Sequence, residues 1–414
     1  MILYSPNAAI MSARSPHRIR IHSQWLVLFD NLLVVTGFYL VFPMITVHFV
    51  ENLGWSATLV STGLALRSLT QQGLGLFGGA MADRWGSKPL IAAGLATRAA
   101  SFLVLAEANN MGWLLLSCVI AGIGGALFDA PKTATIVKLT RPAERARYYA
   151  LLGMLGTLCA SGGAALGSWL LHWDFRWVAY AGAVSFGLAA LITLRFLPAF
   201  RVGVRQDNLF HGLRTAWQDK PYARFVLATA GYWLMWLQVM STLPMLISRL
   251  SGKTHVAWLY TLEMILTLCV QYPLARWLAG RWRCEARLIT GMSLMVLGLL
   301  LVAMAHDNLT LWPALTLFLL GIVLGDPALQ EAGASRIDPR MRGSYLGLAS
   351  LGMALAGSIG YIASGWLYEH ALKWGLPALG WVIIALTGFL TLLLMYQVCY
   401  PMIRTTLQAT APRP

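Results

Sequence analysis

Residues 124–171 read GGALFDAPKTATIVKLTRPAERARYYALLGMLGTLCASGGAALGSWLL, and much of this pattern returns 197 residues later in the chain. Aligned without gaps, the two copies agree at positions that include Gly124, Asp129, Pro142, Arg145, Gly163, Trp169 and Leu170, which fall on Gly321, Asp326, Pro339, Arg342, Gly360, Trp366 and Leu367. Matches of Asp, Pro, Arg and Trp in a single frame rarely arise by chance. The pattern therefore indicates a chain of two related halves.

The composition is typical of a membrane protein. Of the 414 residues, 58% are hydrophobic and 11% are charged, whereas soluble domains carry about 25% charged residues. Mean hydropathy is +0.64, which excludes a disordered chain and argues against a soluble enzyme. A helix needs about 20 apolar residues to cross a bilayer, and it satisfies its own backbone polar groups there. Twelve apolar runs are long enough to be candidates, namely 25–50, 57–82, 89–106, 112–137, 148–171, 177–197, 225–247, 257–278, 288–305, 311–334, 344–368 and 379–400.

These runs predict an all-α integral membrane protein with twelve transmembrane helices in two pseudo-symmetric six-helix bundles. The predicted segments are an N-terminal segment, a first bundle, a central loop, a second bundle and a tail, at 1–24, 25–197, 198–224, 225–400 and 401–414. The first run lacks the short apolar core and cleavage site of a signal peptide, so we expect it to be retained as a helix. Within the central loop, residues 208–220 are predicted to form a short amphipathic helix.

The basic residues indicate the orientation in the membrane. The net charge is +15, from 31 Lys and Arg against 16 Asp and Glu. With the N-terminus inside, 24 of these 31 residues fall in inside segments, four fall in outside loops and three lie within spans. This asymmetry follows the positive-inside rule and predicts cytoplasmic termini. Because the basic residues are dispersed over seven segments, we expect the lipid bilayer and no nucleic acid as a partner.

The stretch GGAMADRWGSK, at 78–88, lies between the second and third spans. Its glycines permit close helix approach, its Asp can face a helix N-terminus, and its basic residues can reach carboxylates or helix C-terminal carbonyls. The stretch resembles the motif G-x-L-A-D-R-x-G-R-K of the major facilitator superfamily, with matches at Gly79, Asp83, Arg84, Gly86 and Lys88. The resemblance implies a cytoplasmic latch between the halves. The corresponding stretch 279–287 lacks the Asp, which implies a one-sided latch.

The fifth span is rich in glycine, and small residues at helical spacing allow helices to pack backbone to backbone. Its pattern also resembles the antiporter motif of the same superfamily, G-x6-G-P-x2-G, with matches at Gly156, Gly163 and Gly167. Ala164 stands where the motif has Pro. Two further departures are Cys118, where many drug antiporters of the family have Arg, and Lys138, where they have an acidic residue.

The resemblance to this superfamily covers about residues 25–400 and points to its drug:proton antiporter branch, on the stretches 29–35, 71–80 and 342–347. It implies an inner-membrane efflux pump, expected to be a monomer, that exports small-molecule drugs in exchange for protons. The alternative is a proton-coupled carrier for a small metabolite such as a sugar or an amino-acid derivative. An enzyme is not expected, since no nucleotide-binding glycine loop or nucleophile elbow is present. The scattered Cys and His predict no metal and no cofactor.

Ionisable residues inside the first half are candidates for proton coupling or substrate binding, because a charge at mid-span costs at least about 2.5–3.5 kcal/mol without a partner. Asp30, beside Asn31, can hold a proton or attract a cationic drug, or else it is a solvated residue near the interface. Arg67 lies four residues before Gln71 on one helix face, and it is positioned to neutralise Asp30 or an acid of span 4. Arg98, in the third span, is a candidate for the same role as Arg67. Alternatively, its long side chain extends far enough for the charge to lie at the membrane interface.

Asp129 and Asp326 are related by the repeat, and Lys132 is placed to pair with Asp129 on one helix face. The other interpretation of the two aspartates is a symmetric structural contact. Glu263, followed by Thr267 at i+4, is the most deeply placed acid of the second half and is a further candidate proton or substrate site.

Aromatic and flexible side chains in the spans can bind varied planar or cationic ligands. The candidates are Phe38, Tyr39, Tyr232, Trp236, Gln238, Met240 and Tyr361. Individually, such residues also serve as lipid-facing anchors.

Overall fold

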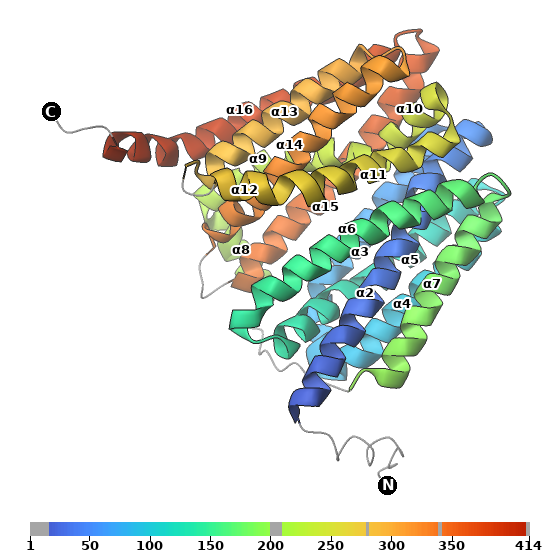
Figure 1. Ribbon diagram of the computed structural model, residues 1–414, viewed down its shortest axis with the longest axis vertical. Helices are drawn as coiled ribbons and strands as arrows, with labels where there is room; N and C mark the ends of the chain where they lie inside the picture. Colours follow the sequence, from blue (N-terminus) through green and yellow to red (C-terminus); the bar gives the residue numbers. More distant parts are fainter. Residues whose placement is uncertain (1–15, 199–208, 279–280, 338–341, 411–414) are drawn as a thin grey trace.

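The computed structural model describes residues 16–198, 209–278, 281–337 and 342–410, and within these ranges the chain is helical without strands. Figure 1 shows the N-terminal half, coloured blue to green, packed beside the C-terminal half, coloured yellow to red. The N-terminal half comprises α2 (Pro16–Thr46) with the π turn η1 (Val47–Asn52), α3 (Ala57–Trp85), α4 (Ser87–Ala106), α5 (Met111–Leu139), α6 (Pro142–Leu170) and α7 (Phe175–Phe196).

The C-terminal half contains more interrupted helices. Between the halves lies the amphipathic helix α8 (Leu209–Gln218), within the segment for which a short helix is predicted. The half itself comprises α9 (Lys220–Trp236), η2 (Leu237–Met240), α10 (Thr242–Ser251), η3 (Lys253–His255), α11 (Val256–Leu266), the π turn η4 (Thr267–Gln271), α12 (Tyr272–Leu278), α13 (Cys284–Ala303), α14 (Asn308–Ala334), α15 (Arg342–Lys373) and α16 (Pro377–Thr410).

Helix boundaries follow local capping chemistry. Asn110 accepts the backbone N–H of Trp113 at 3.1 Å and starts α5. Asp174 and Asp307 start α7 and α14 in the same way. A side-chain oxygen at the N-cap satisfies a donor that the helix leaves free. Gly86, at φ 88°, allows the sharp turn between α3 and α4, because a residue with a Cβ rarely adopts this conformation.

The predicted all-helical membrane fold is confirmed. Among the described residues, ten helices are long and apolar enough to cross a membrane. The predicted spans 57–82 and 257–278 are helical as well but are not among these ten. The first, α3, carries Arg67 and two glutamines in its middle, and the second contains Glu263 and the π turn η4. The number twelve therefore stays a prediction.

The repeat is visible in the packing of each half. A Cβ placed on Gly94 would lie 2.6 Å from the carbonyl oxygen of Gly124, so α4 and α5 touch through their backbones. The C-terminal half repeats this contact between α13 and α14, where a Cβ on Gly291 would lie 2.8 Å from the carbonyl oxygen of Gly321. Both pairs are related by the same shift of 197 residues. Glycine is required at these crossings because larger residues would force the helices apart.

We call the end of the bundle where α2 begins and α16 ends the terminal end, and the opposite end the far end (Figure 1). The halves touch closely at the far end. Glu369 of α15 accepts hydrogen bonds from Ser56 Oγ at 2.5 Å, from Thr58 Oγ1 at 2.9 Å and from the Thr58 backbone N–H at 3.2 Å, all at the start of α3. Tyr368 donates to Glu51 at 2.8 Å. These contacts, together with the hydrogen bond from Ser168 Oγ of α6 to the Lys253 carbonyl at 2.8 Å, join the halves at this end.

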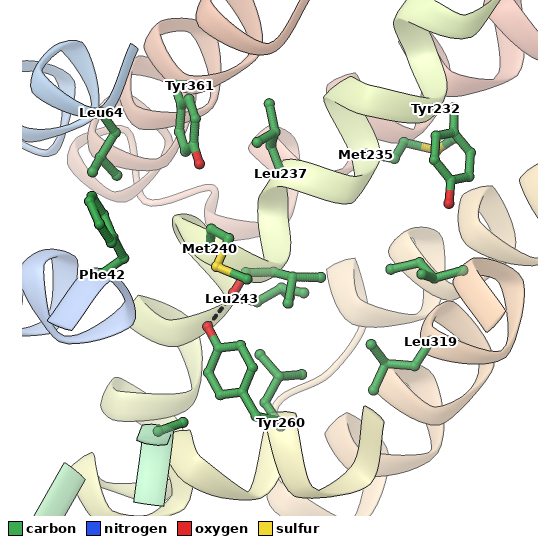
Figure 2. Close-up of a cluster of buried hydrophobic side chains, with 14 of the residues drawn as sticks. Phe42, Leu64, Tyr232, Met235, Leu237, Met240, Leu243, Tyr260, Leu319 and Tyr361 are labelled. Atoms are coloured by element: carbon green, nitrogen blue, oxygen red, sulfur yellow. Dashed lines mark hydrogen bonds between the residues drawn. The ribbon is translucent and has the colours of Figure 1, made fainter. Parts of the chain in front are cut away.

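Nearer the middle, the contact between the halves is mainly apolar. Figure 2 shows part of the buried cluster, in which Phe42 and Leu64 of the first half join Tyr361, Tyr260 and other residues of the second. The Tyr260 hydroxyl donates to the Val239 carbonyl at 2.7 Å, which ties α11 to the turn η2.

Candidate functional site: a central cavity between the halves

A cavity of about 860 Å³ lies between α6 of the first half and α9, α11, η4 and α14 of the second. It falls in the range of about 300–1,000 Å³ that drug-sized ligands occupy. Its wall combines small, aromatic and acidic side chains. The lining residues are Ala150, Gly153, Met154, Thr157, Trp233, Trp236, Glu263, Thr267, Leu268, Gln271, Ile322, Val323, Asp326 and Pro327.

A second, smaller pocket of about 270 Å³ adjoins this cavity. Gly153, Thr157 and Glu263 line both spaces and so mark their junction. Beyond the junction the pocket is lined by residues of α2, α6 and α11, namely Asn31, Val35, Tyr39, Leu152, Gly156, Ala160 and Tyr260. We refer to the larger space as the outer chamber and to the smaller as the inner chamber.

Two carboxyl groups face the outer chamber. Glu263 and Asp326 form no ion pair within the described part of the chain. A charge inside a membrane is tolerated when it meets a cavity, a partner or a proton. The backbone is irregular beside both acids, since η4 begins four residues after Glu263 and Pro327 follows Asp326. Such π turns are frequent at functional sites, and they place Thr267 and Gln271 on the same wall.

A network of polar side chains occupies the first half. Arg67 donates to Gln71 Oε1 at 2.8 Å, and Gln71 Nε2 donates to Asp129 Oδ2 at 2.6 Å. The Arg67 guanidinium also lies 4.6 Å from the ring centroid of Phe42 and 5.5 Å from that of Phe38. The predicted pairing of Arg67 with an acid is thus indirect, through Gln71, and it involves Asp129.

Lys132 donates to Asn31 Oδ1 at 3.1 Å, so its hydrogen bond crosses from α5 to α2. Its relation to Asp129 is electrostatic, without a hydrogen bond between them among the interactions found. Arg98 is 4% exposed, and its guanidinium carbon lies 5.6 Å from the ring centroid of Phe186. It also interacts electrostatically with Asp129.

Asp30 lies apart from this network. It is 4% exposed, it accepts the Thr193 hydroxyl of α7 at 2.6 Å, and its Oδ1 has no hydrogen-bond partner in the described structure. A buried carboxylate with one free oxygen is held at a cost in free energy. The adjacent Asn31 faces the inner chamber. Two neighbouring residues of α2 therefore have different surroundings, a chamber for Asn31 and the packed helix α7 for Asp30.

The predicted aromatic surface is divided by the structure. Trp236 lines the outer chamber and Tyr39 the inner chamber. The Arg67 guanidinium lies over the Phe38 ring. Tyr361 is buried at the contact between the halves and interacts electrostatically with Arg67.

The remaining three predicted residues do not line either chamber. Tyr232 and Met240 are buried (Figure 2). Gln238 donates to Ser364 at 2.8 Å and accepts from Thr242 at 2.5 Å. Gln238 and Met240 lie in the buried turn η2, whereas Tyr232 lies on a buried face of α9.

The superfamily glycines of α6 have two different surroundings. Cβ atoms on Gly163 and Gly167 would meet the backbone carbonyls of Thr36 and Leu40, so these two glycines pack α6 against α2. Gly156 has no described atom within 4 Å of a Cβ position and lines the inner chamber. The expectation of helix packing at Gly156 is not what this conformation shows, because Gly156 borders the inner chamber instead of a neighbouring backbone.

The loop motif is described in part. Gly86 forms the turn into α4, and Arg84 is exposed. The side-chain surroundings of Gly79 and Asp83 lie outside what the structure describes. Lys88 is partly buried at the start of α4.

Sequence reasoning missed several lining residues. Thr157 and Trp233 carry no charge and belong to no motif, and Gly153 does not belong to the antiporter motif. A signal was nevertheless present for one wall, since Ala150, Gly153 and Thr157 recur at three- and four-residue spacing and so share a helix face.

Two repeat-related helical halves that enclose a cavity within a membrane define a secondary transporter. The chain belongs to the Major Facilitator Superfamily, whose family model matches residues 27–330. It is similar to the Multidrug resistance protein MdtH of Sodalis glossinidius (strain morsitans), with 44% identity over 375 residues, 90% of this chain and 93% of that protein. The protein of the same name from Photorhabdus laumondii subsp. laumondii is 43% identical over 90% of this chain and 94% of its own length.

Solved structures show the same fold at low identity. A POT family transporter in complex with a thioalcohol-conjugated peptide has a TM-score of 0.76 at 13% identity, over 92% of this chain and 96% of that one. The nucleoside transporter NupG has a TM-score of 0.74 at 14% identity, over 92% and 98%. The protein is therefore a multi-pass membrane protein of a transporter superfamily, which is not a class of enzymes.

Proposed function

We propose that this protein exports drugs or other small amphiphilic compounds across the inner membrane in exchange for protons, by alternating access of the central cavity. The relatives that share over 40% of their residues with it along nine-tenths of the chain are multidrug resistance proteins by name. The superfamily contains proton-coupled carriers, which is consistent with exchange for protons.

The observation that carries the proposal is the position of Glu263. It lines both chambers, opposite Gly153 and Thr157, and it forms no ion pair with a described residue. A carboxyl group that holds a proton offers no charge to a cationic ligand, and one that holds the cation has released the proton. Mutually exclusive binding at one group is the simplest physical basis for exchange. Asp326 provides a second carboxyl group on the same wall.

The described conformation fits the inward-facing state of such a cycle. Polar contacts close the far end, and the chambers lie on the α6 residues between this end and the terminal end. If the excess of basic residues marks the cytoplasmic side, both termini are cytoplasmic. Each charge moved across a potential of 100 mV then supplies about 2.3 kcal/mol to transport. We propose that one chain carries out the whole cycle, since both chambers are built within a single chain.

The test uses everted membrane vesicles that contain the wild type, Glu263→Gln, Asp326→Asn or, as a matched control outside the chambers, Glu331→Gln. The uptake of a cationic dye into the vesicle lumen, which corresponds to export from the cell, is measured under an imposed pH gradient. We expect a loss of at least about tenfold for Glu263→Gln, since a close charge pair near a protein surface is worth up to about 4 kcal/mol, and little change for Glu331→Gln.

Full gradient-driven efflux in both chamber variants would remove these carboxyl groups from the mechanism. If instead wild-type vesicles moved no dye and deletion in cells reduced only the uptake of a nutrient, the metabolite-carrier alternative would hold.

A further inference from the structure

The glycines on the chamber-facing side of α6 have different surroundings from Gly163 and Gly167 of the same helix. Gly163 and Gly167 touch the backbone of α2, whereas Gly153 and Gly156 have no described atom within 4 Å of the position that a Cβ would take. Glycine weakens a helix relative to alanine, and close helix contact offsets this cost at Gly163 and Gly167. Packing does not explain glycine at 153 and 156. Both face the chambers instead.

The junction between the chambers lies at the first of these two residues. Gly153 and Thr157, one helical turn apart on α6, share the junction with Glu263 of α11. Gly156 lies on the inner side. One wall of the junction therefore carries only the small Thr157 side chain beside Gly153, and the other wall carries a carboxyl group.

The chamber volumes indicate what must pass this junction. The outer chamber, at about 860 Å³, holds a whole drug-sized ligand, whereas the inner one, at about 270 Å³, falls below the usual range of about 300–1,000 Å³ for such ligands. Only part of a ligand fits the inner chamber, where Tyr39 and Tyr260 offer rings 5.5 Å apart in an edge-to-face arrangement. A flat aromatic group suits this space because rings attract each other in stacked and edge-to-face geometries.

We propose that Gly153 and Gly156 set the width limit for substrates, by leaving a gap between α6 and Glu263 through which a flat aromatic group enters the inner chamber while the cationic part of the ligand stays near Glu263. This inference rests on the proposed function and specifies its substrate class as cations with a flat ring system. A larger side chain at either position narrows the gap without replacing any acid of the chain.

The test compares two cationic probes of different shape, ethidium, which has a flat ring system, and tetraphenylphosphonium, which does not. The proteins are the wild type, Gly153→Leu, Gly156→Leu and the control Gly162→Leu. Gly162 lies on the same helix and also has no described atom within 4 Å of a Cβ, but it lines neither chamber. Equilibrium binding to purified protein and efflux from vesicles are both measured, and thermal unfolding reports folding.

We expect Gly153→Leu to weaken ethidium binding by about tenfold or more, because its ring system must pass the narrowed gap and one extra methylene in an apolar pocket already discriminates by about 10–200-fold. Tetraphenylphosphonium, which is too bulky to enter the inner chamber, should lose several-fold less affinity. Gly156→Leu should likewise lower the affinity for ethidium, whose ring would occupy the inner chamber, and Gly162→Leu should change neither probe.

Three results would overturn the width limit alone, with wild-type transport intact. These are equal loss of both probes in folded Gly153→Leu, no change in either chamber variant, or the same loss in Gly162→Leu. Equal loss would show that the glycines serve close helix approach during the cycle. If the wild type moved neither probe, the proposed function itself would fail, and the width limit with it.

Discussion

Glu369 caps a helix of the opposite half, and its removal should open the far end of the protein. The Glu369 carboxylate accepts three hydrogen bonds through Oε2, from Ser56 Oγ and from both the hydroxyl and the backbone N–H of Thr58. These donors lie at the first turn of α3, where the helix dipole also favours a negative charge. Among the described residues, Oε1 accepts a hydrogen bond only from Lys373 of the same helix, at 2.7 Å. Glu369→Ala removes all of these contacts, whereas Lys373→Gln spares the contact between the halves.

The magnitude follows from these contacts. A hydrogen bond to a charged group contributes about 1.5–3 kcal/mol, but three bonds on one oxygen do not add, and the side chain is 18% exposed. We therefore expect Glu369→Ala to destabilise the conformation with a closed far end by about 2–3 kcal/mol relative to the open one. This corresponds to a shift of the equilibrium toward the open conformation by about 30–150-fold. For Lys373→Gln, an exposed pair within one helix, we expect about 0–1 kcal/mol.

The assay is a distance measurement by pulsed electron paramagnetic resonance. Spin labels are placed on the exposed positions Asn109 and Trp374, one in each half, after replacement of the five native cysteines. In Glu369→Ala, the population with a long distance should increase, and in Lys373→Gln it should stay near that of the parent protein. An unchanged distance distribution in Glu369→Ala, or an equal shift in Lys373→Gln, would refute the reasoning.

Two further predictions concern the interior. Gly163→Ala should destabilise the protein by about 1–3 kcal/mol in thermal or denaturant unfolding, because the new Cβ would lie 2.5 Å from the Thr36 carbonyl oxygen. Gly162→Ala, with open space around it, should be neutral or stabilising, and equal destabilisation by both would contradict this account. Tyr232→Phe should leave stability unchanged or raise it by about 1 kcal/mol, because the buried hydroxyl has no hydrogen-bond partner in the described structure; a loss of more than about 1 kcal/mol would show that the hydroxyl is satisfied.

Contacts within one helix were predictable from spacing. Arg67 and Gln71 were placed on one face by their separation of four residues, and the structure joins them at 2.8 Å. Glu263 and Thr267, with the same separation, line the same chamber. Such pairs depend only on the fixed rise and rotation of a helix, so no knowledge of tertiary structure is needed.

Contacts between helices were not predictable in the same way. Lys132 is three residues from Asp129, yet its hydrogen bond goes to Asn31 of α2. Gly156 and Gly163 look alike in the sequence, yet one faces a chamber and the other a backbone. Each outcome depends on how far a helix is rotated toward its neighbours, and this rotation is the result of many contacts between residues distant in the chain.

The sequence by itself determined the duplicated helical architecture of this protein, because apolar runs, the 197-residue repeat and the sorting of basic residues are properties of the chain that need no partner. Only the tertiary structure decided which polar residues face the chambers. Glu263 and Asp326 do so, while Asp30 is buried against α7. All three are acids within apolar runs, so the sequence pattern alone does not distinguish their surroundings. Their difference arises because a cavity lies between α6, α11 and α14, whereas α2 packs directly against α7.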